Sequence, residues 1–259
     1  MLAKALRALK LNRLSKTDKK IFIRYLEVAH PELSAYSFQN IYIWQSLFDI
    51  YWALIEDSLC VFFKDKIGCF LYLPPLGHKS VPEAAEAAFR IMDRFNSDRG
   101  ISRIENVAEK DIPLYEKLGY ESCQKYPEYL LGRSEQAALR GNRFKSKRAV
   151  HNYFIKNYEF DYLPYSSKDR QSCAELYDEW AFWRRLKYTD SLYRGMLDDS
   201  RTCLKILLKD YKGLRFIGRV VKIAGKIKAF TFGFRLNRDT FCIIYEISDL
   251  SVKGIAQFI

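Results

Sequence analysis

Basic and aromatic residues are interleaved within residues 141–158, which read GNRFKSKRAVHNYFIKNY. At the helical period of about 100° per residue, one arc collects Phe144, His151, Phe154, Ile155 and Tyr158. Lys147 falls inside this arc and Arg143 and Arg148 flank it. One interpretation is that these three cations extend along the apolar face with their charged heads in water. The alternative is a site for phosphate or carboxylate, to which arginine offers a bidentate fork and lysine a point charge.

The charge of the whole chain also favours acidic partners. Lys and Arg number 43 against 31 Asp and Glu, which leaves a formal net charge of +12 over 259 residues. Nucleic acid and anionic lipid headgroups both suit this balance, and the charge alone does not choose between them. A hydrophobic content of 49% is ample for a packed core, so the chain is a globular protein.

Several classes of protein are disfavoured. The six cysteines form no C-x-x-C pair and are accompanied by three histidines, so no metal-ligand pattern is present and no metal is expected. The apolar runs are far shorter than the roughly 20 residues that span a bilayer. The basic N-terminal residues 1–20 lack the apolar core and cleavage site of a secretory signal. We therefore expect a reduced, cytoplasmic protein whose contact with a membrane, if it has one, is peripheral.

The elements that position the basic helix follow a repeated order of helices and strands. Helix-forming residues cover 15–40 with an interruption at Pro31. Runs rich in β-branched and aromatic residues predict strands at 52–55, 58–63, 67–73, 101–107, 158–165, 215–223, 226–234 and 240–247. Apolar periodicity predicts further helices at 81–95, 112–120, 169–185 and 198–211. The fold class is α/β (α+β), in two similar domains at 1–127 and 128–259, and the second domain carries the basic helix.

The order helix, helix, three-strand meander, helix resembles the GNAT acyltransferase fold, and residues 115–120, YEKLGY, resemble its late helix. This resemblance implies two tandem GNAT-like domains, each a mixed, mostly antiparallel sheet flanked by helices. Acetyltransferases of that class hold the pyrophosphate of coenzyme A on a Q/R-x-x-G-x-G/A loop at a helix N-terminus. The matching residues here are SVKGIA at 251–256, in which Ser251 replaces Gln or Arg. That replacement argues against acetyl-coenzyme A.

A second resemblance covers most of the chain. Its phrases are SFQNIYIW at 37–44, PPLG at 74–77, Gly141 followed by KR at 147–148, Asn152 and Phe154, AFTFG at 229–233, DTF at 239–241, Glu246 and Gly254. Together they resemble the family of the phosphatidylglycerol lysyltransferase C-terminal domain. This chain departs from the family at Ala149, where Asn is usual, and at Ile247 and Ser248, where Lys and Ala are usual.

The resemblance implies transfer of an amino acid from an aminoacyl-tRNA to a phospholipid headgroup or another envelope acceptor. An activated ester needs a positioned acceptor, removal of a proton and stabilisation of an oxyanion, but no covalent protein nucleophile. By motif position, Lys147 and Arg148 would bind phosphates of the tRNA or of the lipid, and Arg143, Asn152 and Gly254 would complete the substrate site. Glu246 would orient the amine or accept a proton; alternatively, it is a strand-end carboxylate paired with a nearby cation. No cofactor is required beyond the charged tRNA.

Two other functions stay open on the sequence. One is a coenzyme A-dependent GNAT acyltransferase, and the other is a non-catalytic module that binds RNA or an anionic membrane through the basic helix. The neighbouring residues have plainer interpretations. His151 is expected to be a packed histidine and not a base, and Trp180 and Trp183, at helical spacing, are expected in the core.

The C-terminal residues GIAQFI fall inside the helix that follows the fourth strand of a GNAT-like domain. A fifth strand and one wall of the cleft would then be missing, so we expect the second domain to be incomplete. The expected consequences are exposure of Phe258 and Ile259, an open sheet edge, dimerisation or low solubility through that edge, and little transferase activity from this chain alone.

Overall fold

The computed structural model of the protein describes residues 10–29, 32–77 and 81–259. The first nine residues of the basic N-terminal stretch, and Pro31, lie outside the described residues. The chain divides into two compact units. Unit 1 comprises Met1–Pro127 with Leu236–Thr240, and unit 2 comprises Glu128–Arg235 with Phe241–Ile259. None of the helices in the described part of the chain is both long enough and apolar enough to span a bilayer.

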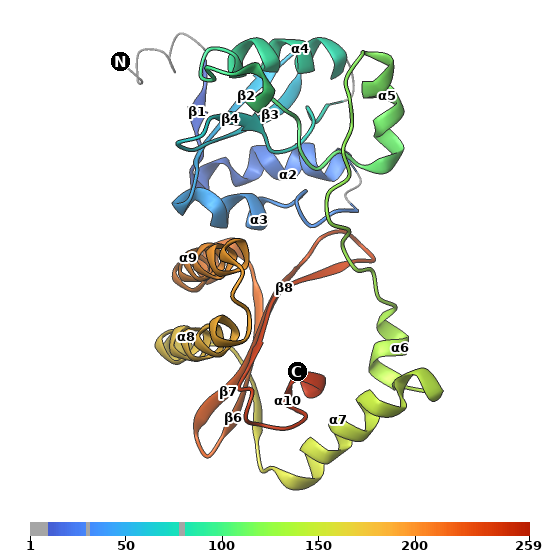
Figure 1. Ribbon diagram of the computed structural model, residues 1–259, viewed down its shortest axis with the longest axis vertical. Coiled ribbons are helices and arrows are strands. Elements are labelled where there is room, and N and C mark those ends of the chain that lie inside the picture. Colours follow the sequence, from blue (N-terminus) through green and yellow to red (C-terminus); the bar gives the residue numbers. More distant parts are fainter. Residues whose placement is uncertain (1–9, 30–31, 78–80) are drawn as a thin grey trace. The chain divides into compact units, whose positions relative to one another are not determined.

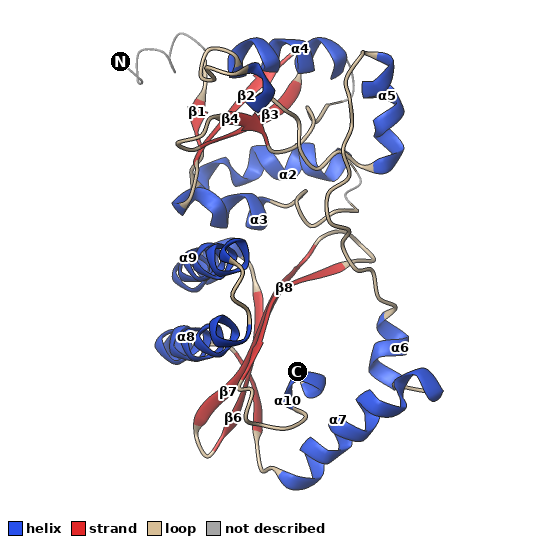
Figure 2. Cartoon of the chain, viewed as in Figure 1, coloured by secondary structure: helices blue, strands red, loops and turns tan. Residues whose placement is uncertain are grey.

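Unit 1 is built on a four-stranded antiparallel sheet in the order β1-β2-β3-β4 (Figure 1). Its strands are β1 (Asn12–Arg13), β2 (Asp49–Ile55), β3 (Ser58–Lys64) and β4 (Cys69–Leu71). Its helices are η1 (Lys16–Asp18), α2 (Lys19–Val28), α3 (Phe38–Ile43), η2 (Trp44–Ser46), α4 (Val81–Met92), η3 (Arg99–Ile101), η4 (Glu109–Asp111) and α5 (Ile112–Lys117). Helices α2 and α3 cover one face of the sheet and α4 covers the other (Figures 1 and 2).

The inner strands of unit 1 are largely buried on both faces because helices lie on each side, whereas both residues of the edge strand β1 are exposed. β3 is buried from Ser58 through Phe63. Phe22 of α2 packs edge-on against Trp52 of β2, with ring centroids 6.0 Å apart. On the other face, α4 presents small residues, including the fully buried Ala88, which let it approach the sheet closely. The expected helix over 15–40 is divided, because α2 ends at Val28 and α3 begins at Phe38.

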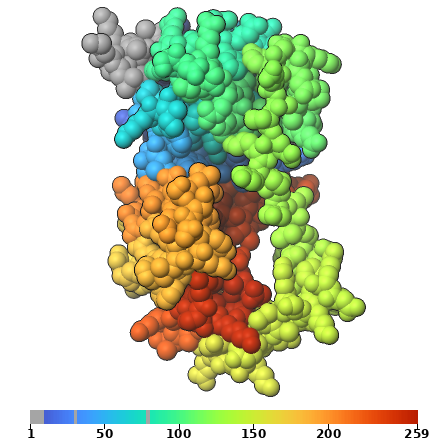
Figure 3. Space-filling view, viewed as in Figure 1, coloured from blue at the N-terminus to red at the C-terminus, as the bar shows by residue number. Residues whose placement is uncertain are grey.

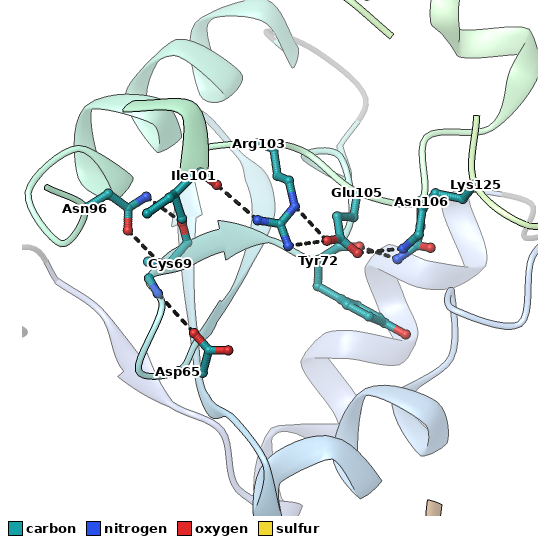
Figure 4. A network of polar contacts seen from close by, with 10 residues as sticks. Asp65, Cys69, Tyr72, Asn96, Ile101, Arg103, Glu105, Asn106 and Lys125 are labelled. Atoms are coloured by element: carbon teal, nitrogen blue, oxygen red, sulfur yellow. Dashed lines mark hydrogen bonds and ion pairs between the residues drawn. The ribbon is translucent and has the colours of Figure 1, made fainter. Parts of the chain in front are cut away.

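The prediction of a strand at 101–107 is wrong, because this segment is extended but held mainly by side chains. Its only ladder contact among the described residues is a parallel bridge between Leu71 and Ile104. The Asn96 side chain forms hydrogen bonds to β4 of the kind that the backbone of a neighbouring strand would form. Its Oδ1 accepts from the Cys69 amide at 2.7 Å, and its Nδ2 donates to the Cys69 carbonyl at 2.8 Å. Asn106, at φ +54°, ends the segment (Figure 4).

Charged side chains complete the network that fixes this segment in unit 1. The Arg103 guanidinium donates to Glu105 at 2.8 Å and lies 4.2 Å from the centre of the Phe70 ring. Lys125 donates to the second Glu105 oxygen at 2.6 Å (Figure 4). Asn106 donates to the Tyr72 carbonyl. Because all of these side chains contact other residues of unit 1, we interpret the network as one that stabilises the fold of this unit.

Unit 2 is built on a second four-stranded antiparallel sheet, in the order β5-β6-β7-β8. Its strands are β5 (Asp161–Pro164), β6 (Ile217–Ile223), β7 (Lys226–Arg235) and β8 (Phe241–Ser248). Its helices are α6 (Arg133–Ala138), η5 (Asn142–Phe144), α7 (Lys145–Asn157), η6 (Ser167–Asp169), α8 (Arg170–Lys187), α9 (Ser191–Leu214) and α10 (Ile255–Phe258). β8 lies at an edge of this sheet.

The two faces of this sheet pack against different layers. Alternate residues of β7 point in opposite directions. Phe232 contacts Tyr211 of α9, with ring centroids 5.9 Å apart. Ala229 instead belongs to a buried cluster with Phe154 of α7 and Ile255 of α10. One face of the sheet is therefore covered by α8 and α9, and the other by α7 and α10 (Figure 1).

The predicted fold class is confirmed by these two antiparallel sheets flanked by helices. The three-strand meander is formed by β6, β7 and β8, as the sequence indicates. α9 begins at Ser191, earlier than expected, because the Asp190 side chain accepts from the Tyr193 amide at 2.8 Å and caps the helix. The prediction of Trp183 in the core is wrong, since this side chain is 52% exposed, whereas Trp180 is half-buried.

Candidate functional site

The register of β7 and β8 decides which layer Glu246 faces. The Tyr245 hydroxyl donates to the Ser200 carbonyl of α9 at 2.6 Å, so Tyr245 points toward α8 and α9. Because side chains alternate along a strand, Glu246 points to the opposite face, toward α7 and α10. Glu246 is paired with Thr231, which lies two residues from Ala229 of the buried cluster. Glu246 therefore lies just beyond that cluster on the same face.

The charge of Lys147 influences the ionisation of the Glu246 carboxyl. Partial desolvation raises the pKa of Glu246, and the positive charge of Lys147 acts in the opposite sense. Lys147 lies in the first turn of α7, on the arc that is buried two turns later at Phe154, yet its own side chain is exposed. The buried face of α7 thus ends in an exposed cation, Lys147, within electrostatic range of the exposed carboxylate of Glu246.

The two predicted arginines have partners within unit 2. Arg148 donates through Nη1 to the carbonyls of Leu139 and Gly141, which follow α6. It therefore caps the C-terminal end of α6, where cations are favoured. Arg143 forms an exposed ion pair with Glu135, and its guanidinium lies 4.9 Å from the centre of the Phe144 ring. Each arginine keeps further N–H groups for a ligand.

Asn152 and His151 are adjacent on α7 and differ in burial. Asn152 is exposed, and its Oδ1 lies 3.3 Å from Nδ1 of His151. The His151 ring is half-buried and stacks on Phe258 of α10, with ring centroids 5.9 Å apart. This contact confirms the interpretation of His151 as a packed residue. Asn152 remains accessible on the helix that carries Lys147.

Gly254 lies where α10 approaches α7 most closely. Its φ of +88° is in the left-handed region, which favours glycine. A Cβ atom there would lie 2.2 Å from the Val150 carbonyl oxygen and 3.0 Å from Cβ of Phe154. Gly254 is also buried. The structure thus gives this glycine a packing role, and its predicted part in substrate binding stays a prediction.

The expectation that Phe258 and Ile259 are exposed is wrong. Both residues are partly buried against the cluster of Phe154 and Ile255. The Phe258 ring lies 4.6 Å from the Phe160 ring, centre to centre, in an edge-on arrangement. The sequence interpretation missed this contact because it placed these residues by resemblance to the GNAT fold and did not connect them with the aromatic residues of the strand predicted at 158–165.

An acidic residue that the sequence interpretation missed fixes the turn between β8 and α10. The buried Asp249 accepts from Lys228 Nζ at 2.6 Å, from the Ser251 amide at 2.8 Å and from the Ser251 hydroxyl at 2.6 Å. Burial opposes ionisation of Asp249, but these hydrogen bonds outweigh it and lower the pKa. The D-x-S spacing at 249–251 is a recognised turn pattern, which could have identified it.

Unit 1 contains a separate hollow of about 220 Å³. Its lining includes Tyr36, Leu76, Lys110 and Tyr115, and the Tyr115 hydroxyl is buried there without a hydrogen-bond partner. None of the predicted site residues lines it. Within the described ranges, no group of three or more His, Cys, Asp or Glu side chains could hold a metal ion.

The arrangement of Glu246 and Lys147 suits proton transfer beside an anionic group. A carboxylate with a raised pKa binds a proton more readily than an ordinary one, so it can act as a base toward a hydroxyl or orient an amine. A nearby lysine can neutralise a phosphate or a developing oxyanion.

Comparisons with known proteins support a family assignment. The family described as "Phosphatidylglycerol lysyltransferase, C-terminal" matches residues 27–259. No curated protein matches the sequence.

The solved structures that resemble the chain include the following two. One is a conserved protein of unknown function from Bacteroides thetaiotaomicron, with a TM-score of 0.81 and 22% identity, over 96% of this chain and 84% of that one. The other is the C-terminal domain of a candidate lysylphosphatidylglycerol synthetase from Agrobacterium fabrum, with a TM-score of 0.57 and 10% identity. That match covers 94% of this chain and 72% of the other. At these identities the likeness concerns the fold alone.

Proposed function

Because the chain belongs to the phosphatidylglycerol lysyltransferase C-terminal family, we propose that it is an aminoacyltransferase with an aminoacyl-tRNA as donor. The acceptor is a phospholipid headgroup or a related envelope group at the inner face of the membrane. The observation that carries the proposal is that Glu246 lies on the sheet face that α7 and α10 cover, within electrostatic range of Lys147 of α7.

In the proposed reaction, a hydroxyl or amine of the acceptor attacks the carbonyl carbon of the aminoacyl ester. Glu246 accepts the proton that the acceptor loses, and a new ester or amide bond forms. The ester bond to the tRNA breaks, and Glu246 gives the proton to the terminal ribose oxygen, which leaves as a hydroxyl and restores the carboxylate. Lys147 supports the negative charge that develops on the carbonyl oxygen or binds the neighbouring phosphate.

The remaining predicted residues extend this site along α7 and before it. Asn152 is exposed and can hydrogen-bond a substrate group. Arg143 and Arg148 would contact phosphates with those guanidinium N–H groups that do not already bond Glu135 or the carbonyls that follow α6. Gly254 contributes by allowing α10 to lie against α7.

The direct test is transfer from a series of radiolabelled aminoacyl-tRNAs to vesicles that contain phosphatidylglycerol. We expect labelled lipid in the presence of the protein, and Glu246→Gln should lower the rate about 100-fold or more. Glu179→Gln removes an exposed carboxylate of α8, on the other layer, and should leave the rate unchanged. Transfer by Glu246→Gln at the wild-type rate would exclude the carboxylate as a base.

The pH dependence of the rate tests the pairing with Lys147. Since only ionised Glu246 can accept a proton, the rate should fall as the pH drops through its raised pKa. Lys147 holds that pKa down, so Lys147→Ala should move the acidic limb to higher pH. Lys156→Ala removes an exposed charge from the same helix and should not move it. An acidic limb that is identical in all three proteins would contradict the pairing.

The coenzyme A-dependent alternative gains no support at residues 251–256. Both the amide and the hydroxyl of Ser251 are used by Asp249, and α10 comprises only Ile255–Phe258. If no aminoacyl-tRNA is consumed and calorimetry detects micromolar binding of acetyl-coenzyme A, the acyltransferase function replaces the proposal. If substrates bind but Glu246→Gln and the wild type are equally inactive, unit 2 is a binding module.

A further inference from the structure

Arg219 lies on the same sheet face as Glu246, in a row of paired residues that crosses three strands. Arg219 of β6 pairs with Thr231 of β7, and Thr231 pairs with Glu246 of β8. Residues that are paired across neighbouring strands point to the same face of a sheet. Neighbouring strands are about 4.8 Å apart, so about 10 Å separates the backbones of Arg219 and Glu246. We call Arg219, Thr231 and Glu246 the polar row.

The contacts of Arg219 place its guanidinium on the side of α7 and α10. The central guanidinium carbon lies 6.0 Å from the centre of the Tyr162 ring. Tyr162 packs edge-on against Phe258 of α10, with ring centroids 5.7 Å apart. Val221 and Ala229, which are paired on this same face, belong to the buried cluster that the sheet forms with α7 and α10. The polar row therefore begins where the buried cluster ends.

Arg219 is a half-buried cation that has no anionic partner among the described residues. None of these residues forms a hydrogen bond or an ion pair with its guanidinium. The Tyr162 ring holds the guanidinium by a cation–π contact, and such a contact leaves the N–H groups in the plane of the guanidinium free. A partly desolvated guanidinium of this kind favours an anion, because a phosphate or carboxylate can replace the lost water with paired hydrogen bonds.

Exposed apolar side chains follow the polar row on the same face. Ile217 of β6 pairs with Gly233 of β7, and Gly233 pairs with Ile243 of β8. The two isoleucines are 50% and 59% exposed. The Phe241 ring lies over Gly233, where a Cβ atom would be 2.5 Å from a carbon of that ring. The C-terminal end of unit 2, red in Figure 3, reaches the surface between α8–α9, in orange, and α6–α7, in yellow-green. A ligand on the polar row thus meets an apolar surface directly beyond it.

We infer that Arg219 binds the phosphodiester of the acceptor whose hydroxyl or amine gives its proton to Glu246. This inference rests on the proposed function. The long side chains of Arg219 and Glu246 span part of the about 10 Å between their backbones, so one molecule with an anionic group and a reacting group a few bonds apart can meet both. The apolar surface beyond the row suits a carbon chain better than the sugars of a nucleic acid. The phosphate on Arg219 is therefore that of the acceptor and not that of the tRNA.

The experiment measures transfer by the full chain while the concentration of either substrate is varied. The acceptor is a short-chain phosphatidylglycerol below the concentration at which it forms micelles, so that binding to a lipid surface does not contribute. Arg219→Gln should raise the KM of the acceptor at least about tenfold, because a charge-assisted contact to a phosphate is lost, and should leave the KM of the aminoacyl-tRNA unchanged. Arg219→Lys keeps the charge without the bidentate fork and should give an intermediate KM.

A matched control and a binding measurement complete the design. Arg170→Gln removes an exposed arginine at the start of α8, on the other layer, and should change neither KM. Calorimetry with glycerophosphoglycerol, the water-soluble headgroup, and with inorganic phosphate measures binding without transfer. We expect the headgroup to bind the wild type at least about tenfold more tightly than Arg219→Gln. Circular dichroism and thermal unfolding establish that the variants fold, and Arg219→Lys serves as the test if Arg219→Gln does not.

Several results would overturn the inference. An acceptor KM that is equal in the wild type and the Arg219 variants would remove Arg219 from the site. A rise in the KM of the aminoacyl-tRNA alone would assign the phosphate to the tRNA, and equal affinity for inorganic phosphate and for the headgroup would leave only a general anion site. If headgroup binding depends on Arg219 but no amino acid is transferred, the transferase proposal fails and the phosphodiester site stands. If transfer proceeds independently of Arg219, the transferase proposal stands and this inference fails.

Discussion

Replacement of Gly254 by alanine should destabilise unit 2 through two separable effects. The first is backbone strain, because φ is +88° and a side chain at positive φ costs about 1 kcal/mol or somewhat more. The second is steric. The new Cβ would lie 2.2 Å from the Val150 carbonyl oxygen, and a helix carbonyl cannot move as a flexible side chain does. Overpacking of this kind costs about 1–3 kcal/mol.

Gly225→Ala is a matched control for the first effect. Gly225 has a φ of +76°, in the tight turn between β6 and β7, and a Cβ there would meet nothing within 4 Å. Both substitutions reduce the freedom of the unfolded chain equally, so this contribution cancels when they are compared. We therefore expect Gly254→Ala to lose about 1–3 kcal/mol more than Gly225→Ala.

The free energies of unfolding can be measured by urea denaturation, followed by tryptophan fluorescence and circular dichroism. Hydrogen exchange read by mass spectrometry should show the loss at residues 145–157 and 255–258, where α7 and α10 meet. Equal free energies for the two variants would refute the close approach of α10 to α7. A normal stability with lost transfer would instead support a direct role of Gly254 in substrate binding.

Three further substitutions test single side chains in unit 2. Asp249→Asn should lower the free energy of unfolding by about 1–3 kcal/mol at neutral pH. Since the folded pKa of Asp249 is lowered, its stabilisation is present above the ordinary aspartate pKa of about 4 and is lost as the pH falls through the folded value. The variant should therefore show a weaker acid dependence in urea titrations, and an unchanged dependence would contradict the assignment. Tyr165→Phe should be neutral or stabilising because the Tyr165 hydroxyl is buried without a partner. Tyr177→Phe should cost about 1 kcal/mol because that hydroxyl donates to the Leu197 carbonyl at 2.8 Å; equal midpoints in thermal unfolding would be inconsistent with this difference.

The sequence by itself determined the meander of unit 2 and the buried side of α7. The runs of β-branched and aromatic residues within 215–247, separated by short turns, predicted the meander, because such residues suit a pleated strand that packs on a core. The periodicity of residues 144–158 placed Phe154 on the buried arc of α7, where it is 0% exposed. The motif phrases from residue 37 to residue 254 were enough to indicate the family. Each of these conclusions rests on local periodicity or on local motifs.

Only the tertiary structure decided what each face meets. Lys147 and Glu246 are far apart in the sequence, and it is the register of β8 on β7 that turns Glu246 toward α7. The same packing gave Arg148 the carbonyls at the end of α6 as partners. Periodicity assigned Trp183 to the core because an apolar residue at helical spacing usually packs, but within unit 2 this side chain is left 52% exposed near the end of α8. A sequence pattern shows which residues share a face, and the long-range arrangement decides whether protein, ligand or solvent covers that face.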